Sequence, residues 1–520
     1  MVKEVYISHP SAGIGSSTFP LVCHVDDGRV IRCLPFRIPD EVKVYEIKTS
    51  RGTFSRSRKD VQIPLAYAWK RRIYENRVKY PLLRRDWDPR NPRSENRGKS
   101  EFVRISWDEA LEIITNVLER TYERFGSMEA VLVQADGRGQ SGAFQSIHFW
   151  GHYLFDKIRE RLGWWTQQVR NPDSWEGYYW GAKHVWGFEE TLGEPYQDAV
   201  WDDILEHAEM VILSGGDPES TAWGTSGSFA QITARWLRQA GIKIVAISPD
   251  LNYFSAVHAD LWIPIKPNTD AALYLAIAYV WIKEGLYDHD YVKTHTIGFE
   301  EFVKYVLGET DSEPKTPEWA EKITGVPTYM IKALTREWAR RRTSLVVYFG
   351  GPKVRGTYSH IVSRIEAYLM AMQGLGKPGR QFVRLSALTL HKKYLAQIPR
   401  YPEVDRDGVF RNPLIGYVLI KEPKSPSFVP RTLVADAILN QVICWQGSTA
   451  MLSPADDQFK KYCFPPRPDH PGIRIIWNEN GSQANSWGYG AKWIKALRSP
   501  KVEFVVAIHP CLRMTYYLLI

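Results

Sequence analysis

Between residues 128 and 285, short runs of apolar residues alternate with polar loops and with stretches of helical periodicity. Such runs, rich in valine and isoleucine, are typical of strands that are buried on both faces of a parallel sheet. Strands are predicted at 130–133, 209–214, 243–248 and 261–265, and helices at 145–162, 229–240 and 271–284. Repeated strand, loop and helix predict an α/β fold with doubly wound, Rossmann-like domains.

The same pattern returns nearer the C-terminus. Residues 288–345 are helical and charged, which indicates an outer layer, whereas the proline-rich residues 395–470 are predicted to be irregular. Further strands are predicted at 345–349, 473–477 and 504–508, and a further helix near 360–373. Upstream, Ser106 with Glu109 three residues later forms a capping box that predicts the start of a helix.

The first 65 residues differ from the rest, because short strand-like runs follow one another without helices. Two such runs flank Asp26-Asp27-Gly28, which is a hairpin signal. We therefore predict a small β-rich domain at 1–65. The remainder is predicted to form a discontinuous α/β domain, 66–170 with 345–520, into which a second Rossmann-like domain, 171–344, is inserted.

Composition narrows the class of protein. The net charge of +9 is spread thinly along the chain and interleaved with acidic residues, so no nucleic-acid partner is predicted. None of the five cysteines has CxxC spacing, which argues against a zinc ribbon or an iron–sulfur cluster in this chain. A sparse, odd set of cysteines and an N-terminus without an apolar leader predict reduced thiols and a cytoplasmic location. No window approaches eighteen apolar residues, so no membrane span is predicted.

Polar and small residues follow the predicted strands. Ser214, Gly215 and Asp217 follow one strand, Asp250 follows the next, and Asp270 follows the third. Ligands of parallel sheets lie beyond the carboxyl ends of the strands, where backbone N–H groups bind phosphate and carboxylates bind ribose or guanine. A nucleotide site is therefore predicted at this edge. The GxGxxG sequence is absent, which disfavours a nicotinamide-dependent dehydrogenase.

The most unusual stretch is 171–188, where an Asn-Pro turn precedes Asp173 and Ser174 and three tryptophans follow within twelve residues. One interpretation is a helix N-terminus that Asp173 or Ser174 caps. The other is a rigid, aromatic-walled loop that presents one oxygen ligand and one carboxylate to a buried site. Local sequence alone leaves both interpretations open.

Several stretches together resemble the dimethyl sulfoxide reductase family of molybdopterin-dependent oxidoreductases. One of them is Gln-Gly-Leu-Gly-Lys-Pro-Gly at 373–379. The whole set is 104–111, 247–262, 264–273, 290–299, 373–379 and 477–481. It follows the family's order over about residues 70–510, so it is much more specific than any single motif. Within the family, 171–188 and 217–219 are most similar to enzymes that transfer hydroxyl groups on phenols.

The resemblance implies a molybdenum or tungsten bis-molybdopterin guanine dinucleotide cofactor, a small phenolic substrate and an iron–sulfur small subunit as partner. It implies that Ser174 supplies an oxygen ligand to the metal, since a serine alkoxide suits a hard, oxophilic centre. Asp173 would act as an acid–base group beside it, and Tyr401 would be a further catalytic residue. The cofactor-binding residues implied are Ser214, Gly215, Asp217, Glu219, Asp250, Asn252, Asp270, Gly351 and Gly481.

Two departures from the family qualify these expectations. The loop after the first strand, 136–143, lacks the catalytic histidine of the similar enzymes that act on phenols, and His148 and His152 are better interpreted as helix-face residues. The family's C-terminal β-barrel domain is missing, so the chain is expected to be truncated, frameshifted or split. Two alternatives therefore stand beside the oxidoreductase: a redox-neutral hydratase or hydrolase at the same metal, and a non-catalytic α/β fragment.

Overall fold

The computed structural model describes residues 2–10, 18–44, 46–55, 58, 78–135, 155, 158–169, 177, 181, 184–185, 200–217, 229–347, 351–353, 358–384, 425–447, 455–479 and 489–508. The chain divides into two compact units. Unit 1 comprises Met1–Ala12, Ser16–Pro64 and Ser174–Pro402, and unit 2 comprises Gly13–Gly15, Leu65–Asp173 and Glu403–Ile520.

Unit 1 begins with an antiparallel sheet of β1 (Lys3–Pro10), β2 (Thr18–Asp26) and β3 (Arg29–Pro35). Asp27 and Gly28 both have left-handed backbone angles, with φ of 45° and 70°. Two successive left-handed residues match the twist of a tight hairpin, so the predicted hairpin is confirmed. A second hairpin, β4 (Glu46–Thr49) with β5 (Gly52–Ser55), buries Phe54 completely in the core of the unit.

The main sheet of unit 1 has the order β12-β11-β10-β13-β14, and all neighbours are parallel. Its strands are β10 (Met210–Ser214), β11 (Lys243–Ser248), β12 (Leu261–Pro264), β13 (Thr343–Val347) and β14 (Phe382–Arg384). The sequence analysis assigned residues from 345 onward to the other α/β domain. In the structure, β13 and β14 instead lie in this sheet, because β13 pairs with β10.

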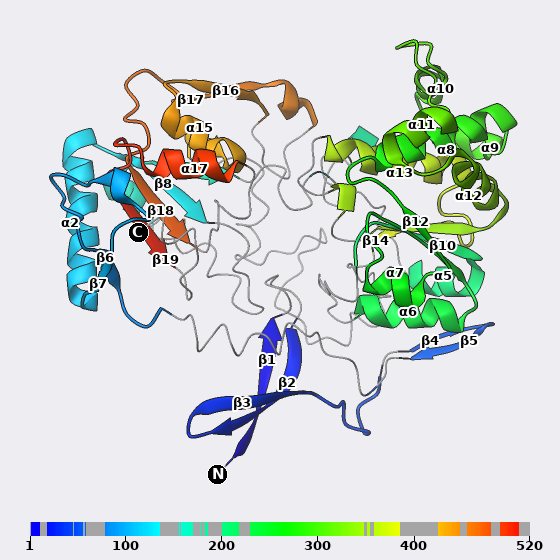
Figure 1. Cartoon of the computed structure of the whole chain (residues 1–520), viewed down its shortest axis with the longest axis horizontal. Coiled ribbons are helices and arrows are strands. Elements are labelled where there is room, and N and C mark those ends of the chain that lie inside the picture. The colour runs from blue at the N-terminus through cyan, green and yellow to red at the C-terminus, as the bar shows by residue number, and fades with distance from the viewer. Residues whose placement is uncertain are drawn as a thin grey trace. The chain divides into compact units, whose positions relative to one another are not determined.

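Helices cover both faces of this sheet (Figure 1). On one face lie α5 (Val200–His207), α6 (Phe229–Gln239) and α7 (Tyr253–His258). On the other lie α8 (Asp270–Glu284), α9 (His289–His295), α10 (Phe299–Leu307), α11 (Pro317–Thr324), α12 (Thr328–Arg340) and α13 (Ser359–Gln373). The central helix α8 is buried on nearly all sides, as its continuous apolar run predicts.

Unit 2 contains a second five-stranded parallel sheet, in the order β15-β9-β8-β18-β19. Its strands are β8 (Met128–Ala135), β9 (Trp165–Val169), β15 (Ser427–Pro430), β18 (Ile475–Glu479) and β19 (Phe504–Ile508). The helix α2 (Trp107–Phe125) precedes β8, and before it β6 (Leu82–Arg84) pairs antiparallel with β7 (Phe102–Arg104). Ser106 caps α2 by accepting a hydrogen bond from the backbone N–H of Glu109 at 3.0 Å, as predicted.

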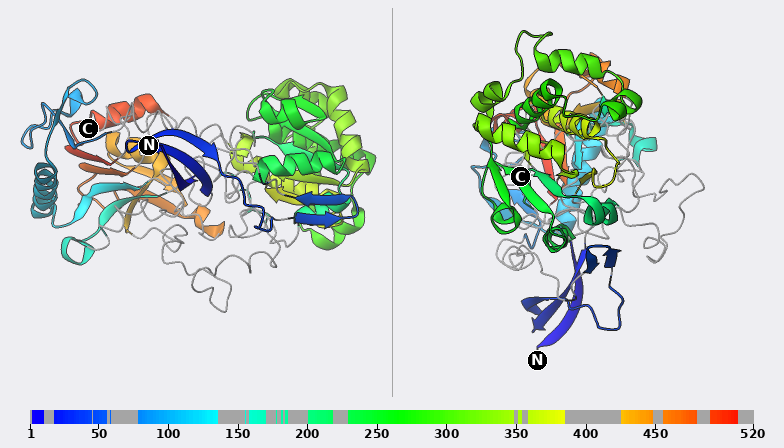
Figure 2. Two further views of the ribbon diagram at one scale, coloured as in Figure 1. Left: turned by 90° about the horizontal axis from the view of Figure 1, so that it is seen from below. Right: turned by 90° about the vertical axis from the view of Figure 1, so that its right-hand side faces the viewer.

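Alternate residues of β8 enter cores on opposite faces of the unit 2 sheet. Val131 and Val133 pack in a cluster against apolar residues of α2, whereas Leu132 packs with α15 (Val434–Leu439) and α17 (Gly490–Leu497). This period of two is what a strand covered on both faces requires. Figure 2 shows the ribbon of the same elements from two further directions. The doubly wound prediction is confirmed for both sheets.

The prediction that 395–470 is irregular is wrong for part of that stretch. Four short 3-10 helices are described: η1 (Ser94–Asn96), η3 (Gly351–Lys353), η5 (Arg431–Leu433) and η6 (Ala455–Phe459). The last two lie in the proline-rich stretch, together with β15, α15, and the hairpin of β16 (Ile443–Gln446) with β17 (Lys461–Phe464). Four-residue strands carry too little periodicity to be recognised beside prolines.

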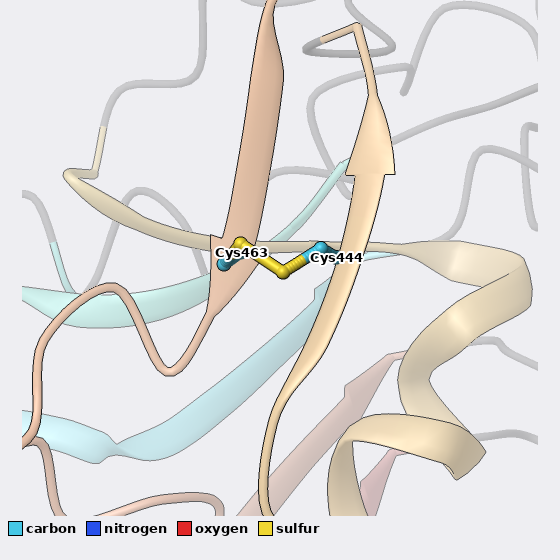
Figure 3. The surroundings of a disulfide bond; sticks show 2 residues. All are labelled: Cys444 and Cys463. Atoms are coloured by element: carbon cyan, nitrogen blue, oxygen red, sulfur yellow. A yellow bond between two sulfur atoms is a disulfide. The ribbon is translucent and has the colours of Figure 1, made fainter.

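A disulfide joins Cys444 of β16 to Cys463 of β17 (Figure 3). The two cysteines face each other directly in the hairpin register. The prediction that all thiols are reduced is therefore wrong, although Cys23 is a buried free thiol. Since that prediction was one ground for a cytoplasmic location, the compartment stays a prediction. Among the described helices, none has the length and apolarity needed to cross a bilayer.

Candidate functional site

The order of the unit 1 sheet reverses between β10 and β13. From β10 the chain continues through β11 to β12 on one side, and β13 and β14 then extend on the other. At such a reversal the loops after the two central strands diverge, which opens a crevice at the carboxyl edge of the sheet. The residues predicted to bind the nucleotide follow these strands, so the crevice is the candidate site.

The loop after β10 approaches the crevice through two glycines. Gly215 and Gly216 have φ of 72° and 91°, which residues with a side chain rarely adopt. The Gly215 N–H donates to the carbonyl of Ile247 at 3.0 Å, and the Asn252 amide donates to the carbonyl of Gly216 at 3.2 Å. The loop is thus fixed to the end of β11, and its backbone can come close to a ligand.

Polar residues tie the same loop to the start of α7. The Asp217 carboxylate accepts from the backbone N–H of Phe254 at 3.2 Å, and Asn252 caps the helix by accepting from the Ser255 N–H at 2.9 Å. Asp250 differs from both, because its carboxylate is exposed and makes no hydrogen bond or ion pair with any other residue that the structure describes. Asp250 is therefore available to a ligand at the crevice.

Beneath the loops lies a buried polar network. The Lys353 ammonium, 2% exposed, donates to the Ser214 carbonyl at 3.1 Å, the Ser214 hydroxyl at 3.0 Å and Glu366 Oε1 at 2.8 Å. The Tyr274 hydroxyl donates to Ser214 Oγ at 2.6 Å, and Ser214 Oγ donates in turn to Glu366. The network joins the end of β10 to η3, α8 and α13, so it fixes the start of the loop after β10.

Burial shifts the ionisation of this network. Burial raises the pKa of Glu366 and of Tyr274, and it raises the pKa of Asp270 to about 6, against the opposing pull of the Lys353 charge. Glu366 Oε2 has no hydrogen-bond partner. One ammonium thus faces two carboxyl groups, and burial favours a proton on one of them.

The structure changes the part that several predicted residues play. The Ser214 side chain is fully buried and committed to the network, and the Asp270 side chain is 3% exposed, so both support the crevice from below. The sequence analysis missed Lys353, Glu366 and Tyr274. Lys353 follows a Gly-Gly-Pro turn after a strand, and Glu366 interrupts an apolar helix face. A lone charge inside an apolar pattern was the available signal.

Gly177 and Gly181, which follow the predicted site residues in sequence, approach α13 closely. Asp173 and Ser174 lie outside the described residues, but Gly177 and Gly181 just after them are described. A Cβ atom on Gly177 would stand 2.8 Å from the Lys353 carbonyl, and one on Gly181 would stand 2.6 Å from the His360 carbonyl. Only glycine allows this contact, so the stretch is held against the helix that also carries Glu366.

The order of the unit 2 sheet also reverses, between β8 and β18, and a ligand crevice is expected at such a reversal. At this reversal, neutral side-chain amides form the buried hydrogen-bond network, in contrast to the charged groups of unit 1. Gln134 donates to Gln168 Oε1 at 2.7 Å, and Asn478 donates to Gln134 Oε1 at 3.2 Å. The remaining predicted site residues, Glu219, Tyr401 and Gly481, and also His148 and His152, lie outside the described residues. The described ranges contain no cluster of three or more metal-binding side chains.

Comparison with known proteins identifies the family. A family model described as molybdopterin oxidoreductase matches residues 77–506, which is most of the chain. The chain belongs to the molybdopterin oxidoreductase family. The predicted resemblance is thereby confirmed, and the two doubly wound sheets are the part of that fold that the structure describes.

Three individual proteins sharpen the comparison. The chain is 32% identical to the pyrogallol hydroxytransferase large subunit of Pelobacter acidigallici over 94% of this chain and 58% of that protein. It is 31% identical to the trimethylamine-N-oxide reductase of Haemophilus influenzae over 59% of this chain and 37% of that protein. Acetylene hydratase from Pelobacter acetylenicus has a similar fold, with a TM-score of 0.55 at 16% identity, over 99% of this chain and 62% of that one. The chain therefore spans less than two thirds of these proteins.

The described loops after β10 and β11 suit a pterin cofactor that carries phosphate. The Gly215–Gly216 backbone could approach a phosphate group, and the exposed Asp250 carboxylate could accept hydrogen bonds from an N–H or hydroxyl group of the cofactor. The buried Lys353 is already saturated with hydrogen bonds, so it would support the loop and would not bind the phosphate. The described residues of this crevice therefore fit the cofactor that the family name implies.

Proposed function

We propose that this chain is the cofactor-binding part of a molybdenum or tungsten bis-molybdopterin guanine dinucleotide enzyme, which carries out redox or hydroxyl transfer on a small, phenolic substrate. The observation that carries the proposal is the 32% identity to the pyrogallol hydroxytransferase large subunit, because it extends over 94% of this chain. The pair of sheets supports it, since the strand order of each reverses beside a central strand, where ligands of parallel sheets bind.

The proposal gives the two units matching parts. In unit 1, Gly215, Gly216 and Asp250 would bind one dinucleotide, with Asp217, Asn252 and Gly351 shaping the loops around it. In unit 2, the loop that contains Gly481 would bind the other. Ser214 and Asp270 would act from below by holding the crevice in shape.

Around the substrate, the chain's own residues would orient the ring and move protons. When bound, the metal centre supplies two-electron redox chemistry. Ser174 would hold the metal through its oxygen, and Asp173 would take a proton from, or return it to, a substrate hydroxyl. Tyr401 and the neighbouring tryptophans would orient a planar substrate and exclude water. Electrons would pass through a small partner subunit that carries an iron–sulfur cluster. The large-subunit name of the relative supports only the presence of a partner subunit.

The test is a substitution of Ser174. The chain is produced anaerobically with molybdate, with its partner subunit when one is found, and metal content and pyrogallol consumption are measured. Ser174→Ala is expected to lose metal and activity while its circular dichroism is unchanged. Ser100→Ala, a serine that lies on a turn in unit 2, is the matched control and should keep both. Full activity of the Ser174→Ala protein would refute the assignment.

A redox-neutral hydratase is the second candidate, favoured by the structural likeness to acetylene hydratase, which at 16% identity concerns the fold alone. The two candidates differ in electron flow. A hydratase would turn over without any electron acceptor or donor, whereas an oxidoreductase would not. A chain that folds but binds neither pterin nor metal would instead support the non-catalytic fragment.

A further inference from the structure

A cavity of about 670 Å³ lies in the helical layer of unit 1, lined by residues of α8, α9, α10 and α13 and by His184 and Val185. Figure 1 shows these four helices grouped on one side of the sheet. The volume falls within the roughly 300–1,000 Å³ of typical small-molecule sites. None of the strand-end residues of the crevice lines the cavity, so it is a different place from the proposed dinucleotide site.

The floor of the cavity is apolar and well packed. Val292, Ile365 and Met372 line it and are 5%, 4% and 1% exposed. The rim is exposed and polar, with His295 of α9 and Glu301 of α10. A deep apolar floor with a polar rim favours an organic ligand, because burial of apolar ligand surface supplies the free energy of binding.

Aromatic rings form the walls. Tyr291 and His295 stack in parallel, with ring centroids 4.3 Å apart and an interplanar angle of 8°. Phe302 and Tyr368 meet edge to face, with centroids 5.1 Å apart. Walls of this kind offer both faces and edges to a planar ring, and such contacts add to the free energy that burial alone supplies.

One cation lies among these apolar groups. Arg364 of α13 lines the cavity and is half-buried; its Nε donates to the Tyr368 hydroxyl at 3.4 Å. Among the described residues, no carboxylate forms an ion pair with it, and Glu301 at the rim is no exception. The Arg364 charge also helps burial to lower the pKa of the neighbouring His360. The guanidinium therefore keeps a positive potential that a carboxylate could satisfy with two parallel hydrogen bonds.

We propose that this cavity binds a small aromatic carboxylate, whose ring packs between the aromatic walls and whose carboxylate pairs with Arg364. The proposal needs no metal centre and does not depend on the proposed function. Arg364 and Glu366 are two positions apart on α13 and so point to nearly opposite sides of the helix. The ligand would therefore lie on the side of α13 that faces away from the buried network.

The test uses benzoate as the probe and isothermal titration calorimetry on the 520-residue chain. Benzoate should bind saturably with one site per chain, and benzamide, which keeps the ring but lacks the charge, should bind at least tenfold more weakly. Arg364→Gln should weaken benzoate at least tenfold, with Arg364→Lys between it and the wild type. Arg340→Gln removes an exposed charge from α12 and is the matched control, expected to bind as the wild type does.

A second variant guards against an effect of Arg364 on folding. Ala371→Phe would place a ring in the cavity and leave Arg364 unchanged, so it should abolish benzoate binding while thermal unfolding stays close to that of the wild type. The proposal is overturned if the folded wild-type chain shows no saturable benzoate binding, or if Arg364→Gln or Ala371→Phe binds benzoate as tightly as the wild type.

Discussion

In both units the strand order of a five-stranded parallel sheet reverses beside a central strand, between β10 and β13 in unit 1 and between β8 and β18 in unit 2. The groups that fix these two places differ. Unit 1 uses Lys353, Glu366 and Ser214, whereas unit 2 uses the neutral amides of Gln134, Gln168 and Asn478. The same geometry can thus be held by buried charge or by buried dipoles, and the two choices respond differently to mutation and to pH.

The largest difference is expected when one partner is removed from each network. Lys353→Met leaves Glu366 buried without its cation, which should lower the free energy of unfolding by about 3–5 kcal/mol. The matched change in unit 2, Gln134→Leu, leaves amide partners unsatisfied and should cost about 1–3 kcal/mol. Denaturant unfolding of the two variants beside the wild type measures both.

The control for this difference is the double variant Lys353→Met with Glu366→Gln. Because it removes both charges together, most of the lost stability should return. A double variant no more stable than Lys353→Met alone would show that the lysine acts through packing and not through its charge.

Acidity should separate the two units next. The pKa of Asp270 in unit 1 is raised by burial to about 6, so the folded state holds a proton that the unfolded state releases above the ordinary pKa of 3.8. Stability from this group is complete below that value and is lost as the pH rises to about 6, by about 3 kcal/mol at most. Asp270→Asn should remove the part of this fall that Asp270 causes, and the part caused by the raised pKa of Glu366 should remain.

In unit 2 the dependence of stability on pH is expected to have the opposite sign. His470 is buried and accepts or donates a hydrogen bond with Ser427 at 2.8 Å, and burial lowers its pKa from 6.5 to about 4. The unfolded state therefore gains a proton first, and stability falls as the pH drops from about 6.5 to about 4. His470→Gln should remove that fall. Unfolding midpoints of the wild type and of both variants, measured from pH 4 to pH 7, give the pH dependence of stability that each residue causes. The same sign of pH dependence for Asp270 and His470 would contradict these expectations.

A smaller effect is expected where the stretch after Ser174 meets α13. Gly181→Ala would push a methyl group against the His360 carbonyl and the Ser363 side chain, which should cost about 1–3 kcal/mol through overpacking. Adding Ser363→Gly should relieve the side-chain part of the clash and restore some stability. Thermal unfolding of the single and double variants gives the coupling free energy between positions 181 and 363. Additive effects would mean that Gly181 does not contact Ser363 of α13.

The sequence predicted the regular part of the fold because long apolar runs report burial directly. The strands of both sheets that come from such runs, β8, β10, β11, β12, β13, β18 and β19, were all predicted. The edge strand β15 was not, because its four residues lie among prolines and are defined by pairing with β9. The disulfide was missed for a similar reason, since only the hairpin register brings Cys444 opposite Cys463.

The residues of the candidate site likewise divide into those whose position the sequence predicted and those that it missed. Gly215, Asp217 and Asp250 were predictable, because a strand followed by a polar loop fixes their place at one edge. Lys353 and Glu366 were not, because they lie 13 positions apart and only the packing of η3 against α13 makes them partners. Sequence patterns report burial along one element, whereas a buried ion pair is a property of two elements.

The most direct test of the central claim is the ratio of nucleotide to metal in the purified protein. If each crevice binds one pterin dinucleotide, acid hydrolysis should release two guanine nucleotides for every molybdenum or tungsten atom. Asp250→Ala should lower that ratio toward one, because it alters only the unit 1 crevice. A protein that is folded and metal-loaded but releases one guanine nucleotide per metal, or none, would contradict the claim that each crevice binds one pterin dinucleotide.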